Sequence, residues 1–460
     1  MKTKSFYKAG KTLLILFLSI VIIGGCNNPP KGEQQSSGLP ETQPPEWSKN
    51  AAIYEVNIRQ YTPEGTFNAF AGHIPRLKEL GVDILWLMPV HPIGEKNRKG
   101  SLGSYYSIKD YYGINPEFGT EEDFRNLVNQ IHEAGMYIIL DWVANHTAWD
   151  NPLINEHPEW YTQNEEGEII APVDDWTDVA DLNYDRPEVR EYMTDALTYW
   201  VDEFNIDGYR CDVAGMVPTD FWNQARRELD KIKPVFMLAE ANEPELHEEA
   251  FDMTYAWDIH FLWNEMAQGK KNMADLVNQL EKEKTKYPQD AYRMLFTSNH
   301  DENSWKGTVY DRLGDATETF AVLSATLPGM PLIYSGQEAC LDKRLKFFEK
   351  DTISWDQECS MFDLYQTLLT LKEENEALWN GAWGGSMERI ATPADDHIFA
   401  FARTKGEHQV VTVLNLSENE IDVELPEDLE NKQLVEVFSG EPLASSYTMK
   451  PWGYKVFTTP

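Results

Sequence analysis

Residues 187–212 read PEVREYMTDALTYWVDEFNIDGYRCD, and this stretch combines a helix with a following strand. Pro187 suits the first turn of a helix, and apolar residues recur at helical spacing from Val189 to Phe204. The shorter segment 206–212 has the length of a strand and ends in a carboxylate, Asp212. This helix–strand unit predicts an α/β architecture.

The same alternation extends in both directions along the chain. Eight short segments read as strands separated by helices: 51–58, 83–88, 136–141, 206–212, 235–240, 252–257, 292–298 and 331–334. Short apolar strands of this kind are typical of a parallel sheet that is covered on both faces. We therefore predict a (β/α)8 TIM barrel over residues 47–384, with a doubly wound open sheet as the alternative.

Two departures from the repeat predict additional structure. The connection after the third strand is long and rich in Trp, Asp, Asn and Pro, so we expect a small inserted subdomain at about residues 147–186. After residue 385, five short strand-like segments follow without intervening helices. They predict a C-terminal antiparallel β-sandwich over residues 385–460.

The first 46 residues have the pattern of an export segment. Lysines precede an apolar run at 13–23 that is too short to span a bilayer, and the run leads into Ile23-Gly24-Gly25-Cys26. This junction resembles the lipobox of bacterial lipoproteins, which implies a signal peptide at 1–25 and lipidation of Cys26. A Pro-rich tether follows at 26–46. We expect export and lipid anchoring to a bacterial membrane, at the cell surface or the periplasmic face of the outer membrane, with a plain signal peptide or an uncleaved anchor as the alternatives.

Charge and cysteine content limit the partners and the cross-links. Asp and Glu number 76 against 40 Lys and Arg, a formal net charge of −36, so phosphate-rich nucleic acid is excluded as a partner. Besides Cys26 the chain holds only Cys211, Cys340 and Cys359. Because three cysteines cannot all pair, we predict no structural disulfide.

Acidic residues follow four of the predicted strands. Asp141, Asp212, Glu240 and Asp301 stand at strand ends, beside His146, His300 and Arg210. The carboxyl ends of barrel strands meet at one rim, where the active sites of such barrels lie. The sequence therefore predicts one site that is rich in carboxylates.

Glycoside hydrolysis is the chemistry that best suits these groups, because it needs one ionised and one protonated carboxyl group around a single bond. Arg210 shares a strand face with Asp212 and should keep that carboxylate ionised as the nucleophile. Glu240 follows the apolar residues 237–239, which should raise its pKa and suit it as the acid/base. A metal-dependent hydrolase is the alternative, although neither His-x-His nor His-Glu-x-x-His occurs.

DWVANH (141–146), GYRCD (208–212), AE (239–240) and FTSNHD (296–301) resemble the four sequence regions of the α-amylase family of glycoside hydrolases. ADLN (180–183) and GSYYSIKDYYGINPEFG (103–119) resemble two further family segments. The resemblance implies a retaining enzyme that acts on an α-glucan or maltooligosaccharide. It assigns Asp212 as nucleophile, Glu240 as acid/base and Asp301 as the third acid; substrate contacts to Tyr106, His146, Arg210 and His300; and calcium ligation to Asn145 and Asp181.

Departures from the family pattern leave the specificity open. Gly215-Met216 stand where typical α-amylases carry Lys-His, which weakens both the calcium assignment and endo action. Val213 and the ADLN segment favour relatives that act on α-1,6 bonds or on short oligosaccharides. An α-1,6-acting or oligosaccharide-specific glucosidase or transglycosylase, and a non-catalytic glucan-binding lipoprotein, remain the alternatives.

Overall fold

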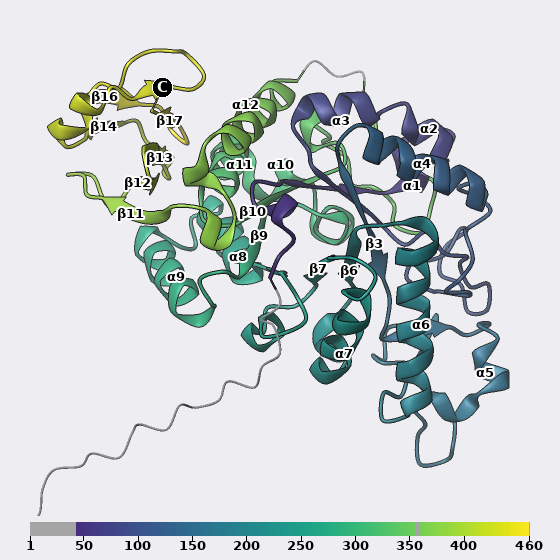
Figure 1. The fold of residues 1–460 in the computed structure, drawn as a ribbon. Helices are drawn as coiled ribbons and strands as arrows, with labels where there is room; N and C mark the ends of the chain where they lie inside the picture. The colour runs from purple at the N-terminus through teal and green to yellow at the C-terminus, as the bar shows by residue number, and fades with distance from the viewer. Residues whose placement is uncertain (1–42, 356–358, 460) are drawn as a thin grey trace, which may run out of the picture. The chain divides into compact units, whose positions relative to one another are not determined.

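The fold, known from a computed structural model, is described for residues 43–355 and 359–459 (Figure 1). In this part of the chain, eight parallel strands close into a barrel in the order β1-β10-β9-β8-β7-β6-β3-β2. The strands are β1 (Ile53–Val56), β2 (Ile84–Leu87), β3 (Tyr137–Trp142), β6 (Gly208–Cys211), β7 (Phe236–Ala239), β8 (Met253–Tyr255), β9 (Tyr292–Phe296) and β10 (Met330–Tyr334). Each coincides with one of the eight predicted segments to within one residue at the ends of β3 and β10, so the closed barrel is confirmed and the open sheet is wrong.

Helices alternate with the barrel strands and pack around them (Figure 1). Their bounds are α1 (Ile58–Tyr61), α2 (Phe67–Ala71), α3 (Ile74–Leu80), α4 (Glu121–Glu133), α6 (Pro187–Phe204), α7 (Thr219–Leu229), α8 (Trp257–Ala267), α9 (Met273–Lys286), α10 (Val309–Leu313), α11 (Thr317–Thr326) and α12 (Met361–Glu374). Helix α4 begins with a capping box in which Thr120 and Asp123 bond reciprocally. Helix α6 begins with Pro187 and ends at Asn205 in the left-handed conformation, a common C-terminal stop.

Two apolar layers hold the barrel together. One cluster fills the interior with side chains such as Trp86, Phe236 and Leu238, all fully buried. A larger cluster includes the inward faces of the helices, for example Leu197 and Trp200 of α6. The division follows from the strand geometry, because successive side chains point to opposite faces of the sheet.

The segment after β3 forms a small two-stranded sheet. Strands β4 (His146–Ala148) and β5 (Val179–Asp181) pair antiparallel, with His146 opposite Asp181. A short helix, α5 (Leu153–Glu156), lies between them in sequence. This segment corresponds to the predicted insertion and brings residues 175–179 to the site described below.

The C-terminal part is antiparallel, as predicted. One sheet has the order β11-β12-β13-β17-β15, and β14 pairs with β16. The strands are β11 (Ser386–Ile390), β12 (Ile398–Lys405), β13 (His408–Asn415), β14 (Ile421–Glu424), β15 (Val435–Glu436), β16 (Ser446–Met449) and β17 (Tyr454–Thr458). Buried Arg403 donates to Leu327 O at 3.1 Å and Tyr454 donates to Glu318 at 2.9 Å, which joins these sheets to the barrel. Residues 41–460 form one compact unit, so the boundary expected at 384/385 stays a prediction.

The prediction of no structural disulfide is wrong. Cys340 and Cys359 are joined, with their Cα atoms 5.8 Å apart, a usual spacing for a disulfide. An odd number of cysteines forbids complete pairing but allows one pair, and Cys211 is the buried thiol left over.

The predicted signal peptide, Cys26 and most of the tether lie outside the described residues. Within the described ranges, no helix is both long and apolar enough to cross a bilayer.

Candidate active site

The predicted polar residues surround one pocket of about 470 Å³ at the carboxyl ends of the barrel strands. Its lining includes, from the predicted set, Tyr106, His146, Asp212, Glu240, His300 and Asp301. Five different segments deliver these groups, following β2, β3, β6, β7 and β9, and His300 and Asp301 share the last of them. Asp141 and Arg210 are fully buried beneath the pocket.

Arg210 connects three of the carboxyl groups. Its Nη1 lies 2.9 Å from Asp141 Oδ1 and 3.0 Å from Asp212 Oδ1, and its Nη2 lies 2.9 Å from Glu240 Oε2. The three acids come from β3, from the end of β6 and from the end of β7. One guanidinium group therefore holds Asp212 and Glu240 close enough together to flank a single bond.

Burial shifts the ionisation of this cluster, and the pKa of Glu240 moves in the direction predicted from the sequence. Burial and the neighbouring Glu240 raise the pKa of Asp212 well above its usual value, against the lowering effect of Arg210. Burial also raises the pKa of Glu240, again opposed by Arg210. Arg210 contacts both acids and opposes the effect of burial on the pKa of each, so the ionised nucleophile at Asp212 stays a prediction.

The two histidines of the pocket carry different charges. Burial lowers the pKa of His146 to about 4, so that imidazole is neutral. Although burial also opposes protonation of His300, the carboxylates of Asp301 and Glu55 raise its pKa to about 9. His300 donates to Glu55 through Nδ1, while its Nε2 lies 2.9 Å from the Tyr106 hydroxyl and 3.4 Å from Asp301 Oδ2. The site thus combines one neutral hydrogen-bonding imidazole with one imidazolium.

Tyr106 lies at the floor of the pocket, where its ring can meet a sugar. Its hydroxyl donates to Asp141 Oδ2 at 3.0 Å, and its ring stacks on His300 with centroids 5.4 Å apart. The ring of Phe347 also stacks on Tyr106, with centroids 6.1 Å apart, and lies 6.2 Å from the His300 ring. A flat aromatic surface beside hydrogen-bonding acids suits a sugar ring, which has apolar faces and polar edges.

Several residues that shape the site escaped the sequence analysis. Glu55 accepts from His300, the Tyr255 hydroxyl accepts from Arg210 Nε at 3.1 Å, and the Trp305 indole donates to Asp301 Oδ1 at 3.2 Å. Glu55 offered a signal, because it is the one charged residue in the apolar strand IYEV. Tyr255 and Trp305 act through contacts between distant segments, so no local sequence pattern indicates their role.

Asn145 and Asp181, the predicted calcium ligands, lie beside the pocket rather than in its lining. Asn145 Nδ2 donates to Asp181 Oδ1 at 3.5 Å, and burial raises the pKa of Asp181. The nearby carbonyl of His146 accepts from the Tyr111 hydroxyl. Calcium takes six to eight oxygen ligands, whereas this pair offers one carboxylate and one amide that bond to each other. Among the residues that the structure describes, no group of three His, Cys, Asp or Glu could hold a metal ion, and this donor set does not fit calcium.

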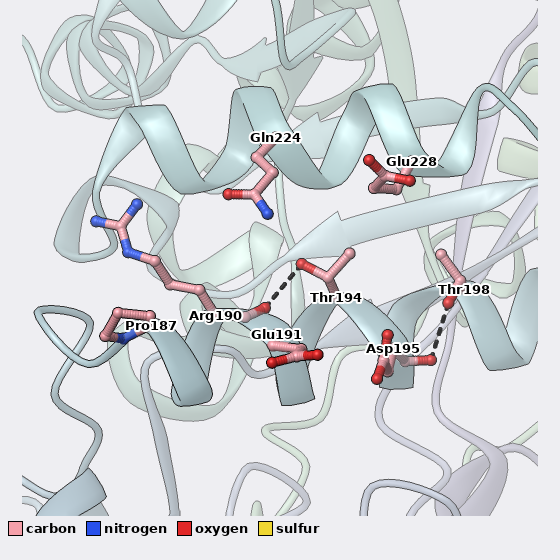
Figure 2. A pocket seen from close by; sticks show the side chains of 8 residues that line it. All are labelled: Pro187, Arg190, Glu191, Thr194, Asp195, Thr198, Gln224 and Glu228. Carbon is pink, nitrogen blue, oxygen red and sulfur yellow. Dashed lines mark hydrogen bonds between the residues drawn. The ribbon is translucent and has the colours of Figure 1, made fainter.

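A second depression of similar volume lies between α6 and α7, on the helical exterior (Figure 2). Its threonine hydroxyls bond to carbonyls of their own helix, Thr194 to Arg190 O and Thr198 to Asp195 O. Its other polar lining residues are three acids, one arginine and one amide: Glu191, Asp195, Glu228, Arg190 and Gln224. Figure 2 shows no set of groups converging on one point there, so the candidate site remains the pocket at the strand ends.

The chain is similar to known proteins in sequence and in fold. The family model "Alpha amylase, catalytic domain" matches residues 35–361, and the model "Maltogenic Amylase, C-terminal domain" matches residues 389–456. The chain is 28% identical over 418 residues to the alpha-amylase MalA of Haloarcula japonica, a match that covers 86% of this chain. The chain spans 59% of the length of that relative.

Two solved structures match over nearly their whole length. The noncanonic maltogenic alpha-amylase AmyB of Thermotoga neapolitana superposes with a TM-score of 0.79 at 32% identity, covering 90% of this chain and 97% of its own. An alpha-amylase from Lactobacillus plantarum superposes with a TM-score of 0.80 at 31% identity, covering 90% and 99%.

Proposed function

The chain belongs to the α-amylase family of glycoside hydrolases, which act on α-glucans, and we propose that it hydrolyses α-glucosidic bonds of maltooligosaccharides and starch-like glucans with retention of configuration. One observation carries the proposal: Arg210 joins Asp212 and Glu240 at the floor of a pocket whose wall includes Asp301. Retaining glycosidases require two carboxyl groups on either side of one bond.

In the proposed mechanism, Asp212 attacks the anomeric carbon while protonated Glu240 gives its proton to the leaving oxygen. The bond between Asp212 and the sugar forms as the glycosidic bond breaks. Glu240, now ionised, removes a proton from water, and the resulting oxygen displaces Asp212 from the sugar. The raised pKa of Glu240 favours the proton donor in the first step, and Arg210 stabilises the carboxylates that appear in turn.

Asp301 and the two histidines position the sugar in this proposal. Cationic His300 and the carboxyl group of Asp301 can hydrogen-bond neighbouring hydroxyl groups of the sugar, and neutral His146 can accept or donate a further hydrogen bond. Interactions that strengthen as the ring distorts lower the barrier to cleavage. The ring of Tyr106 would lie beneath that sugar.

The test combines a product profile with matched variants. Chromatography of products from starch, pullulan, isomaltose and maltotriose should show cleavage of α-1,4 linkages, and cleavage of isomaltose would instead favour the α-1,6-acting alternative. Asp212→Asn, Glu240→Gln and Asp301→Asn should each lower turnover by about 10³-fold or more. The control is Asp220→Asn, which removes an exposed carboxylate on α7 that pairs with Arg190 of α6. This variant should retain full activity. If the protein without substitutions binds glucan but releases no reducing ends, the result would support a non-catalytic binder.

The names of the relatives guide the substrate range. AmyB of Thermotoga neapolitana is named a maltogenic amylase, and the C-terminal part of this chain matches the maltogenic amylase model. We therefore favour short maltooligosaccharides over long starch chains as the preferred substrates.

Since Asn145 and Asp181 provide too few oxygen ligands, we expect full activity after dialysis against EDTA, which would also argue against a metal-dependent hydrolase.

We also propose that the exported protein is held at a membrane by lipid on Cys26. The support is the sequence alone: an apolar run at 13–23, small residues at 24 and 25, and the cysteine that follows. In a bacterial host, the parent chain should partition into detergent and incorporate labelled fatty acid. The Cys26→Ser variant should lose both properties. Equal partition of parent and variant into the aqueous phase would contradict lipid anchoring.

A further inference from the structure

One side of the pocket is closed by contacts between loops that are distant in sequence. The loop between β2 and α4 carries Lys99, whose Nζ donates to Asp175 O at 2.7 Å and lies 3.2 Å from Asp178 Oδ1. Both acids belong to the inserted segment, and all three residues line the pocket. The Ser107 hydroxyl donates to Asp178 O at 3.1 Å and reinforces the same junction.

The same β2–α4 loop is also bonded to the loop between β10 and α12. Leu102 N donates to Phe348 O at 3.1 Å, and Ser101 N donates to Glu349 Oε1 at 2.9 Å. At Gly100, an added Cβ would lie 2.4 Å from the Cβ of Phe348, so the two loops pack without room for a side chain. Phe347 and Phe348 line the pocket at this junction.

The β10–α12 loop is bonded in turn to the segment after β9. Asn303 Nδ2 donates to Lys343 O at 3.0 Å, and Arg344 donates to Ser304 O at 2.7 Å. Trp305 of this segment packs on Phe347, with ring centroids 5.3 Å apart. A bonded wall therefore runs from Trp305, through the β10–α12 and β2–α4 loops, to Asp178 of the insertion.

The barrel order places this wall opposite the proposed acid. Around the closed barrel, β1 is four strands from β7 in either direction, and β2 and β10 flank β1. Glu240 follows β7, whereas the central part of the wall rises from the loops after β2 and β10. A general acid must stand beside the oxygen that leaves, so the leaving group extends towards Glu240. The sugar that stays on Asp212 extends towards the wall.

The side near Glu240 is where a leaving chain can extend. Met216, which follows the end of β6, is 46% exposed, and Phe261 near the start of α8 is 50% exposed. Large exposed apolar side chains near a pocket suit the apolar faces of further sugar units. Neither residue lines the pocket itself, so a contact with the chain would be made outside it.

We propose that this enzyme attacks α-glucans only from the non-reducing end, because the wall closed by Lys99 leaves no path for a chain that continues beyond the pocket. Lys99 is accordingly a specificity-determining residue: its ion pair with Asp178 holds the β2–α4 loop against the insertion. The proposal rests on the retaining α-glucan hydrolysis proposed above and specifies its substrates as chains with a free non-reducing end. The pocket volume, at the lower end of the range of about 300–1,000 Å³ for ligand sites, fits a short glycone.

The test compares maltoheptaose, labelled at its reducing end, with the same compound carrying an ethylidene bridge across O4 and O6 of the non-reducing glucose. The parent enzyme should shorten the labelled chain of the free compound by units of one length from the first time point. The capped compound should react at least about 100-fold more slowly, since a closed pocket excludes the added group. Lys99→Ala should raise the capped-to-free rate ratio by about tenfold or more.

Lys96→Ala is the matched control, because Lys96 lies on the same loop but its ammonium group sits over the Trp149 ring, 5.6 Å from its centroid, outside the pocket lining. Its rate ratio should equal that of the parent. Ser101→Ala combined with Glu349→Ala opens the other junction of the same loop and should act like Lys99→Ala.

Each failure has its own signature. Equal cleavage of the capped and free compounds by the parent would overturn the closed end and leave the proposed hydrolysis standing. A ratio unchanged in both opened variants would overturn the role of Lys99 and the loop. No cleavage of the free compound would instead refute the proposed function, and this inference with it.

Discussion

Replacing Arg210 with methionine tests whether the buried guanidinium supports the reaction. Methionine keeps much of the length and volume of the side chain but removes the charge that lies 3.0 Å from Asp212 and 2.9 Å from Glu240. Two unit charges about 4 Å apart interact by about 4 kcal/mol at an effective dielectric constant of about 20. At about 1.4 kcal/mol for each factor of ten, loss of that attraction should lower kcat/KM by about 10³-fold near neutral pH.

The direction of the pH effect follows from the same contacts. Arg210 lowers the pKa of Asp212 and of Glu240, so its removal raises both values further. The nucleophile must be ionised, and the acid limb of the kcat/KM profile should therefore move to higher pH. The assay is the initial rate on a labelled maltooligosaccharide between pH 5 and pH 9.

The matched control is Arg226→Met on the outside of the barrel. Arg226 is also buried, and its Nη1 lies 3.0 Å from Asp252. Removal of either arginine leaves a buried carboxylate without its cationic partner and should lower the free energy of unfolding by about 3–5 kcal/mol. Only Arg210→Met should move the pH profile. If Arg210→Met, confirmed to be folded by circular dichroism, keeps kcat/KM within about tenfold of the parent and the same acid limb, the reasoning is refuted.

Three further predictions concern the fold and the site. Reduction, or Cys340→Ser with Cys359→Ser, should lower the free energy of unfolding by about 2–4 kcal/mol in a urea titration, because the bridge closes a loop between positions 19 residues apart; an unchanged midpoint would contradict this. Burial raises the pKa of Asp83 to about 6 in the folded chain, so this residue contributes stability that is complete below pH 4 and is lost as pH rises to 6; Asp83→Asn should flatten that part of the stability profile, and an identical slope in the variant would argue against it. Tyr106→Phe removes a hydrogen bond to the buried Asp141 and should lower kcat/KM by about ten- to 100-fold while keeping the aromatic ring; steady-state kinetics measure this, and unchanged kcat/KM would show that the hydroxyl has no part in the site.

The barrel could be predicted from the sequence because its strands are buried on both faces. A run such as YIILDW has no exposed position to interrupt the apolar pattern, and helices with one apolar face separate each strand from the next. The C-terminal strands β11 and β16 escaped prediction for the opposite reason. Strand β11 has no buried residue, and the alternation Ser-Tyr-Thr-Met in β16 extends over only four residues.

The strand ends also predicted which acids meet, since parallel strands of a barrel deliver their carboxyl ends to one rim. The contacts among those acids could not be predicted in the same way. That Arg210 reaches both Asp212 and Glu240 depends on neighbouring strands and their register. The pairing of Cys340 with Cys359 and the junction made by Lys99 likewise depend on how loops fold in space.

The most direct test of the central claim is to identify the residue that becomes covalently bound to the sugar. The Glu240→Gln variant is incubated with α-maltosyl fluoride. The fluoride is a good leaving group that needs no acid, whereas the variant lacks the base that activates water, so the bound sugar should accumulate. Mass spectrometry of the digested protein should find a maltosyl group on the peptide that contains Asp212. A maltosyl group on another carboxylate, or none on a variant that still consumes the fluoride, would contradict the account.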